Sequence, residues 1–245
     1  MNQPVEFSSP GHPVVWVTGA SSGIGRSIAE SFARIGAQVA LSARREGLLE
    51  EVAKTIWASG GVCEIFPCDV RSSSCVSDAH EMIVKRLGSV DVLVNNAGIN
   101  HAKLVTEMSE DQFDDVIATN LRGAFLCAKQ VLPSMIEKSR GHIFMISSVA
   151  AKTWFHRYGA YSASKAGLAA FASVLREEVR KYGIKVTTIY PGATASEIWA
   201  KHTLEKHRQR MMRPEDIGSL VITLYQQSHR MLVEDVIVRP IGGDL

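Results

Sequence analysis

The sequence predicts a doubly wound α/β sandwich, in which helices cover both faces of a central parallel sheet of about seven strands. Two observations lead to this fold class. Short apolar runs alternate along the chain with longer amphipathic stretches, as in proteins where each strand is followed by a helix. The runs are continuous and rich in Val and Ile rather than alternating with polar residues, which indicates strands buried on both faces.

Each apolar run defines one expected strand, and the longer segments between the runs define the crossover helices. The first strand leads into a helical pattern that continues through Arg34 and stops at Gly36, because glycine commonly follows the end of a helix. The seven strands are expected at Val14 to Val17, Val39 to Leu41, Val62 to Phe66, Val90 to Val94, His142 to Ile146, Val186 to Ile189 and Val236 to Val238.

The domain organisation follows from where these patterns begin. Residues 1–13 are rich in Pro, Ser and Gly and lack periodicity, which predicts a flexible N-terminal leader. No linker, low-complexity tract or internal repeat divides the remainder, so we expect one domain over residues 14–245.

Composition excludes several classes of protein. The 245 residues include 27 Lys and Arg against 25 Asp and Glu, a net charge of +2, so nothing indicates a nucleic-acid-binding protein. No apolar run approaches the ~20 residues of a membrane-spanning helix, and no signal-peptide pattern is present, so we expect a cytoplasmic protein without membrane contact. The spacing of Cys63, Cys68, Cys75 and Cys127 fits reduced thiols and does not match a metal site.

The turn after the first strand has the chemistry of a phosphate site. Glycines let the backbone turn tightly and approach a pyrophosphate, and the free N–H groups at the start of the next helix attract its negative charge. Strand, glycine turn and helix coincide here, which favours dinucleotide binding in a Rossmann-type fold over a plain turn. The run reads Thr18, Gly19, Ala20, Ser21, Ser22, Gly23, Ile24 and Gly25.

The spacing of this turn, TGxxxGIG, resembles that of the short-chain dehydrogenase/reductase family, in its compact single-domain, NADP(H)-preferring branch. Further marks of the family follow in order over the whole chain past the leader. They are Asn95, Asn96, Ala97 and Gly98 after the fourth strand, Asn120 in the next helix, Ser147 and Ser148 after the fifth strand, Tyr161 with Lys165, and Pro191 with Gly192.

The residues after the second strand predict the cofactor. No acid stands where one would hold the ribose 2′-hydroxyl of NAD, whereas Arg44 offers a planar fork of donors for a 2′-phosphate, with Arg45 beside it. We therefore expect NADP(H). Some NADP-using relatives also carry a basic residue in the glycine turn, where this chain has Ser22. Asp69 and Val70 resemble the family's adenine-side contact, although Asp69 equally reads as a loop acid at a strand end.

Tyr161 and Lys165 lie four residues apart in a helical segment, which places them on one face. A tyrosine pKa of ~10 must fall by about three units, worth ~4 kcal/mol, for proton exchange near neutrality. One lysine charge about 4 Å away supplies ~4 kcal/mol at an effective dielectric of ~20. The spacing alone would fit an exposed helix pair without chemistry, but Ser148 and the glycine turn favour a tyrosine acid activated by lysine.

The resemblance implies a role for each residue of this centre. Tyr161 exchanges a proton with the carbonyl oxygen of the substrate, and Ser148, rather than Ser147, hydrogen-bonds the same oxygen. Lys165 binds the nicotinamide ribose as well as tuning Tyr161, and Asn120 holds a water that relays protons through Lys165. The further cofactor contacts implied are Asn96, Ala97 and Gly98 by close backbone approach, Pro191 and Gly192 beside the nicotinamide, Thr194, and Ser196, which replaces the family's usual threonine.

The substrate side of the chain is more individual. A variable lid is expected near residues 193–213; its cations form either a surface for an acidic substrate or carrier protein or, as we favour, a solvated helix face. Trp154 and Phe155 either line an aromatic pocket or pack in the core. The C-terminus lacks the valine-aspartate-glycine-glycine ending common in 3-oxoacyl carrier-protein reductases.

Together these features predict an NADP(H)-dependent oxidoreductase that reversibly reduces a ketone or aldehyde to an alcohol. The alternatives are a 3-oxoacyl-[acyl-carrier-protein] reductase-like enzyme and a non-catalytic NADP(H)-binding regulator. The presence of both Tyr161 and Lys165 favours the enzyme. The resemblance also implies a homo-oligomer, either a tetramer or a dimer.

Overall fold

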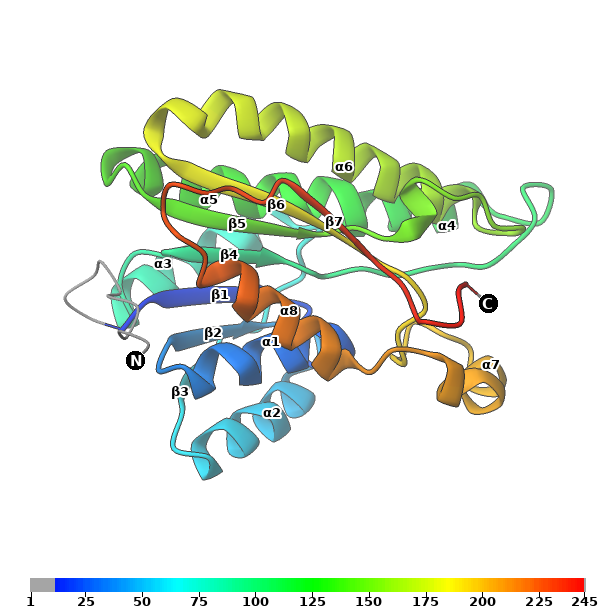
Figure 1. Cartoon of the computed structure of the whole chain (residues 1–245), viewed down its shortest axis with the longest axis horizontal. Helices are drawn as coiled ribbons and strands as arrows, with labels where there is room; N and C mark the ends of the chain where they lie inside the picture. Colours follow the sequence, from blue (N-terminus) through cyan, green and yellow to red (C-terminus); the bar gives the residue numbers. More distant parts are fainter. Residues whose placement is uncertain (1–11, 245) are drawn as a thin grey trace.

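The computed structural model describes residues 12–244, and its strands form one parallel sheet in the order β3-β2-β1-β4-β5-β6-β7 (Figure 1). This confirms the predicted fold class. Most of the expected leader, residues 1–11, lies outside the described residues. The strands are β1 (Val14–Thr18), β2 (Gln38–Ser42), β3 (Val62–Ile65), β4 (Val92–Asn95), β5 (Gly141–Ile146), β6 (Ile184–Pro191) and β7 (Asp235–Val238).

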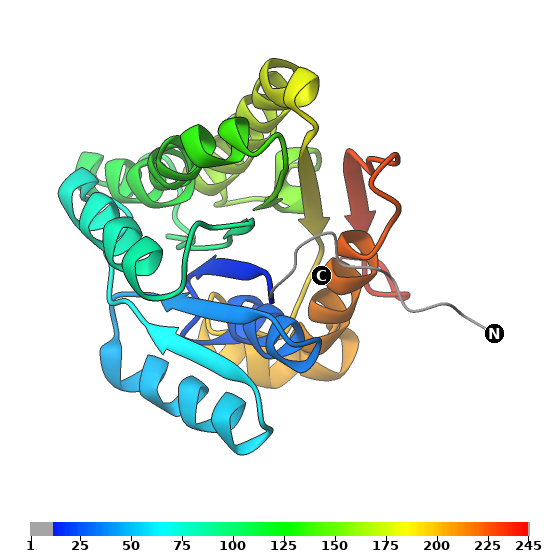
Figure 2. The same cartoon turned by 90° about the vertical axis from the view of Figure 1, so that its left-hand side faces the viewer.

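Helices cover both faces of the sheet, as Figures 1 and 2 show. One face carries α1 (Gly23–Arg34), α2 (Glu46–Ala58) and α8 (Pro214–Tyr225). The other carries α3 (Ser73–Arg86), α5 (Gly123–Glu137) and α6 (Gly159–Val179). The short helix α4 (Glu110–Ile117) packs against α6 and continues into α5 through a π-helical stretch at Ala118–Arg122 that periodicity did not predict. The short helix α7 (Lys201–His207) lies in the segment after β6.

The sheet is the centre of the core. Every residue of β1 is buried, which is why Val14 to Val17 are continuously apolar instead of alternating with polar residues. Trp16 is fully buried, and its indole Nε1 donates to Ser42 Oγ on β2 at 2.9 Å, so the ring packs without an unpaired polar atom.

The strand order determines where a ligand fits. β1 pairs with β2 on one side and with β4 on the other. The strand order therefore runs outward from β1 to β3 on one side and outward from β4 to β7 on the other. Such a switch point opens a crevice at the carboxyl ends of the strands. The segments after β1, β4, β5 and β6 meet at this crevice and carry the sequence motifs.

His142 on β5 is a buried, neutral histidine. Its ring stacks on Phe144 with centroids 3.9 Å apart, and its Nε2 lies 2.9 Å from Thr187 Oγ1. The Thr187 hydroxyl donates to the Val233 carbonyl, so its oxygen accepts a hydrogen bond from the Nε2–H of His142, and this fixes the tautomer. Burial, with the nearby charge of Lys185, lowers the pKa of His142 to about 3.

His142 should make the fold sensitive to mild acid. An unfolded histidine has a pKa of about 6.5, so the unfolded state binds more protons as the pH falls below that value. The resulting loss of stability between pH 7 and pH 5 is about 2 kcal/mol. Urea unfolding at pH 7 and at pH 5 gives the change in the free energy of unfolding between the two pH values. We expect this change to be smaller in His142→Gln than in the wild type by about the same amount, whatever the absolute stability of that variant. An equal drop in both proteins would contradict the assignment, and the exposed His202→Gln serves as the control.

Candidate functional site

A cleft of about 880 Å³ opens at the carboxyl ends of the strands. It is lined by every residue predicted to bind the cofactor and by Ser148, whereas Asn120 lies just behind the wall. The predicted residues on the wall are Gly19, Ser21, Ser22, Gly23, Ile24, Gly25, Arg44, Arg45, Asp69, Val70, Asn96, Ala97, Gly98, Ser148, Tyr161, Lys165, Pro191, Gly192, Thr194 and Ser196.

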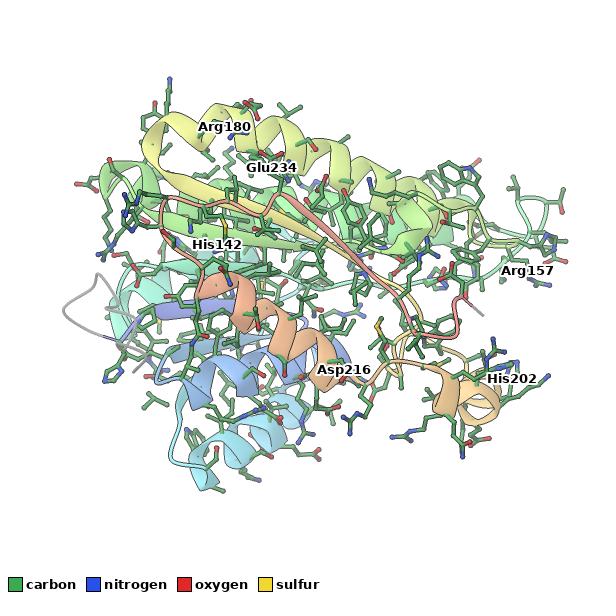
Figure 3. All side chains as sticks on the ribbon, in the orientation of Figure 1. His142, Arg157, Arg180, His202, Asp216 and Glu234 are labelled. Carbon is green, nitrogen blue, oxygen red and sulfur yellow. The ribbon has the colours of Figure 1, made fainter. Side chains whose placement is uncertain are left out.

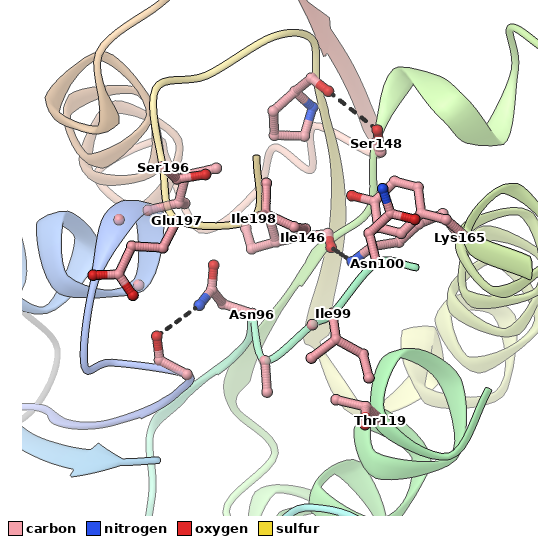
Figure 4. A pocket seen from close by; sticks show the side chains of 18 of the residues that line it. Asn96, Ile99, Asn100, Thr119, Ile146, Ser148, Lys165, Ser196, Glu197 and Ile198 are labelled. Carbon is pink, nitrogen blue, oxygen red and sulfur yellow. Dashed lines mark hydrogen bonds between the residues drawn. The ribbon is translucent and has the colours of Figure 1, made fainter. Parts of the chain in front are cut away.

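The glycine turn is held closely against the segment after β4. Gly19 has a φ of +65°, and a Cβ there would lie 2.8 Å from the Ala97 Cα. Asn96 Nδ2 donates to the Thr18 and Gly19 carbonyls at 3.0 and 3.1 Å (Figure 4). Asn96 therefore anchors the turn through its side chain, a structural role that its motif did not indicate.

The helix after the turn presents free donors to the cleft. α1 begins at Gly23, and the first backbone hydrogen bond of the helix runs from Arg26 N to the Ser22 carbonyl at 3.2 Å. The preceding amides have no partner inside the helix, and together with its dipole they favour an anion. This geometry is that of a phosphate cradle.

The basic end of the cleft, which we define as Ser21, Ser22, Arg44 and Arg45, lies between this turn and β2. Arg44 is exposed and forms no hydrogen bond or ion pair with any residue in 12–244. Arg45 Nη2 lies 3.4 Å from both serine hydroxyls and 2.9 Å from Glu197 Oε2. The Arg45 guanidinium thus binds protein partners, whereas the Arg44 guanidinium is available to a ligand.

Asp69 faces the cleft but is tied to a neighbour. Both of its carboxylate oxygens accept hydrogen bonds from Arg71, at distances from 2.7 to 3.1 Å. These bonds, with smaller contributions from the charges of Arg71 and Arg44, lower the pKa of Asp69. Arg71 also reaches Asp115 Oδ1 at 2.6 Å, so the acid helps to order the loop that borders the cleft.

Ser148, Tyr161 and Lys165 come together on the opposite wall. The Ser148 hydroxyl lies beside the Tyr161 side chain, where it partly offsets the rise in the pKa of Tyr161, and it donates to the Pro191 carbonyl at 3.5 Å. Lys165 is buried, and its Nζ donates to the Ile146 carbonyl at 2.7 Å (Figure 4). The Ser147 hydroxyl instead donates to the Lys165 carbonyl at 3.0 Å, so its hydrogen is already bonded within the protein.

The expected tyrosine pKa is wrong for this arrangement. Lys165 Nζ lies 5.7 Å from the centroid of the Tyr161 ring and donates to the Ile146 carbonyl. Burial raises the pKa of Tyr161 to about 12 and lowers the pKa of Lys165 to about 8. Both groups lose hydration on burial, and that loss outweighs their mutual attraction.

Asn120 is fixed by three hydrogen bonds. Its Nδ2 donates to the Ile99 carbonyl at 2.9 Å and to Ser164 Oγ at 3.0 Å, and its Oδ1 accepts from Ile99 N at 2.8 Å. A Cβ on Gly98 would lie 3.4 Å from Asn120 Oδ1 and 3.5 Å from Lys165 Nζ. Glycine at this position keeps open the space on which both polar atoms converge.

The outer wall of the cleft is aromatic. Phe155, His156 and Tyr158 line it, and the Tyr158 ring meets those of Phe155 and Tyr161 edge-on at centroid distances of 6.1 Å. Trp154 is 74% exposed and contributes neither to the cleft nor to the core, so both expectations for it were wrong. It lies in an exposed loop where its neighbour Phe155 turns inward instead.

The segment 193–213 leaves the sheet and returns to it. Thr194 and Met212 form an isolated parallel bridge that closes its base. The cations of α7 face away from the cleft, and Figure 3 shows His202 at the outer edge of the molecule. Lys201, His202, Lys206, Arg208 and Arg210 do not line the cleft, in agreement with a solvated helix face.

The wall also contains residues to which sequence reasoning gave no individual role, among them Asn100, Tyr158, Glu197, Ile198 and Asp244. Glu197 and Ile198 lie within the expected lid and Tyr158 follows Trp154 and Phe155, so these three carried a usable signal. Asp244 lines the cleft and forms an ion pair with Arg239, which no motif marks.

Other site classes find no support in the part of the chain that the structure covers. Residues 12–244 contain no group of three or more His, Cys, Asp and Glu able to hold a metal ion, and all four cysteines are free. Within the same range, none of the helices combines the length and apolarity needed to cross a bilayer.

Comparison with known proteins agrees with the motifs. The family model described as short chain dehydrogenase matches residues 13–207. Sepiapterin reductase from Chlorobaculum tepidum is 34% identical over 239 residues, which cover 95% of this chain and 98% of that protein.

Solved structures give the same result. A metagenomic short-chain oxidoreductase in complex with NADP superimposes with a TM-score of 0.84 at 34% identity and covers 95% of this chain and 99% of its own. A variant of actinorhodin polyketide ketoreductase with NADPH superimposes with a TM-score of 0.86 at 31% identity, and the match covers 94% of this chain and 96% of its own. The resemblance inferred from the motifs is confirmed, and the chain belongs to the short-chain dehydrogenase/reductase family of oxidoreductases.

Proposed function

We propose that this protein is an NADP(H)-dependent oxidoreductase that reduces a ketone or aldehyde to an alcohol, reversibly. One observation carries the proposal. A phosphate cradle and an uncommitted arginine form one side of the cleft, and Ser148, Tyr161 and Lys165 form the other. A dinucleotide held by the first group would present its reactive end to the second.

NADP(H) fits the residues of the cleft. Gly19 and Gly23 have positive φ and no side chain, so the backbone donors of the cradle stay accessible. Arg44 has no hydrogen bond or ion pair among residues 12–244 and is available to a 2′-phosphate. Two similar solved structures contain NADP or NADPH. When bound, NADPH supplies the hydride that reduces the carbonyl carbon.

The chain's own residues handle the proton and the orientation. Ser148 donates a hydrogen bond to the carbonyl oxygen of the substrate, and Tyr161 donates the proton to that oxygen. The raised pKa of Tyr161 keeps its hydroxyl protonated near neutrality, which suits proton donation in the reductive direction. Lys165 and Asn120 border the space at Gly98 through which we propose that a water reprotonates the tyrosine.

The aromatic wall indicates the kind of substrate. Phe155 and Tyr158 offer flat apolar surface beside the polar centre, which suits a carbonyl attached to a ring or an apolar chain. The similar sepiapterin reductase and polyketide ketoreductase point to ketones of this kind.

The test is oxidation of NADPH and NADH by the purified protein with a panel of carbonyl compounds. The panel contains sepiapterin, aryl and alkyl ketones, aldehydes and 3-oxoacyl thioesters. Turnover with NADPH supports the proposal and identifies the carbonyl class, and preference for the thioesters would favour the carrier-protein reductase. Tight NADPH binding without turnover on any compound would favour the non-catalytic regulator.

Arg44→Asp should reverse the charge that meets the 2′-phosphate. Charge-assisted hydrogen bonds contribute about 1.5–3 kcal/mol, and the introduced carboxylate adds repulsion. We therefore expect the Kd of NADPH to rise by about 100-fold while that of NADH changes by less than about threefold. Fluorescence titration of both cofactors measures this. Lys54→Asp on α2, an equal charge change at an exposed residue, should leave the ratio as it is; an unchanged ratio in Arg44→Asp would refute the role.

A further inference from the structure

The segment after β6 places a carboxylate at the basic end of the cleft. Glu197 Oε2 accepts a hydrogen bond from Arg45 Nη2 at 2.9 Å, and the same nitrogen lies 3.4 Å from Ser21 Oγ and Ser22 Oγ. In Figure 4, Glu197 lies on the side of the pocket opposite Ser148 and Lys165. An acid is therefore present in this region, although it comes from about 150 residues beyond the strand where sequence reasoning looked for one.

Packing holds Glu197 in this place. A Cβ on Gly23 would lie 2.9 Å from Ser196 Cβ, so the residue before Glu197 packs directly on the glycine turn. Trp199 Nε1 donates to the Thr194 carbonyl at 2.9 Å and closes the backbone around it. Glu197 thus belongs to an ordered part of the wall and not to a freely moving surface loop.

The ion pair competes with a phosphate for the same donor. Among the described residues, three acceptors surround Arg45 Nη2, of which only Glu197 is charged. A 2′-phosphate bound between Arg44 and Arg45 would draw on that nitrogen and would also be repelled by the carboxylate. NADH carries no phosphate there and leaves the pair undisturbed.

We propose that Glu197 is a cofactor-specificity residue that weakens binding of the 2′-phosphate by holding Arg45 in an ion pair. This inference rests on the proposed NADP(H) site. The two arginines then have different roles. Arg44 supplies the main preference for the 2′-phosphate, and the Arg45–Glu197 ion pair reduces that preference. The Arg45 and Glu197 side chains are 56% and 59% exposed, so the pair is weak enough for a ligand to replace.

The experiment isolates the phosphate with two small probes. Adenosine 2′,5′-bisphosphate and 5′-AMP differ only by the 2′-phosphate, and calorimetric titration at fixed ionic strength gives both Kd values without turnover. In Glu197→Gln we expect the bisphosphate to bind about 3- to 10-fold more tightly and AMP to change by less than about twofold. Glu205→Gln on α7 removes an equal charge from an exposed residue with no ion pair in the described chain, and should change neither Kd.

Repeating the substitution in an Arg45→Gln protein tests whether Glu197 acts through Arg45. In Arg45→Gln the gain from Glu197→Gln should shrink to less than about twofold, because the donor that Glu197 withholds is gone. The inference is overturned if the bisphosphate Kd is unchanged in Glu197→Gln, or if Glu197→Gln tightens bisphosphate binding equally with and without Arg45. In either case, tighter binding of the bisphosphate than of AMP by the wild type would still support the NADP(H) site. Equal binding of both probes to the wild type would overturn the inference and the proposed cofactor together.

Discussion

Tyr161→Phe should abolish most turnover while leaving NADPH binding almost unchanged. The substitution removes only the hydroxyl, and the ring keeps its edge contact with Tyr158 and its place 5.7 Å from Lys165 Nζ. A positioned general acid contributes about 10²- to 10⁴-fold to the rate. We expect kcat to fall within that range for the best carbonyl of the panel, with the Kd of NADPH within about twofold of wild type.

Tyr158→Phe is the matched control, because Tyr158 also lines the cleft and also carries a pKa raised by burial. The Asn100 side chain lies near its hydroxyl and opposes part of that rise in pKa. Loss of this contact should lower kcat/KM by no more than about tenfold, which is the scale of one neutral hydrogen bond. If Tyr158→Phe lost as much turnover as Tyr161→Phe, or if Tyr161→Phe stayed active, the assigned acid would be wrong.

The sheet was predictable because its sequence signal is local. The strand at Val14–Thr18 is buried on both faces, so its residues are apolar except Thr18, whose hydroxyl donates to the Val94 carbonyl. The glycine turn was predictable for a similar reason: Gly19 adopts positive φ, and only glycine takes that conformation without strain. In both cases the backbone restricts the residue type, so the residue type reveals the backbone.

Other features depend on contacts that the sequence does not encode locally. Glu197 reaches Arg45 only because the segment after β6 packs on Gly23, and nothing around Glu197 marks that contact. The pKa of Tyr161 depends on burial, which the spacing to Lys165 does not report. The i, i+4 spacing correctly placed the two side chains near each other but could not give the separation of 5.7 Å or the desolvation that outweighs the lysine charge.

Gly25→Ala should disable the cofactor cradle. Gly25 lies in α1, where its conformation is ordinary, so the requirement for glycine is one of space alone. A Cβ there would lie 2.2 Å from the Gly19 carbonyl oxygen and 2.3 Å from Asn96 Nδ2. Neither atom can retreat easily, because Asn96 Nδ2 holds the Thr18 and Gly19 carbonyls and the first helical turn is tied to Ser22.

The turn must therefore shift away from α1, which misaligns the amides that would hold the pyrophosphate. Loss of two charge-assisted hydrogen bonds raises the Kd of NADPH by about 100-fold or more, and overpacking lowers the free energy of unfolding by about 1–3 kcal/mol. Calorimetric titration and urea unfolding measure the two effects. Gly47→Ala in α2 makes the same change where nothing lies within 4 Å, and should keep NADPH affinity while raising stability slightly. Wild-type NADPH affinity in a folded Gly25→Ala protein would mean that the cradle does not bind the pyrophosphate, because that steric conflict cannot be relieved without moving the turn.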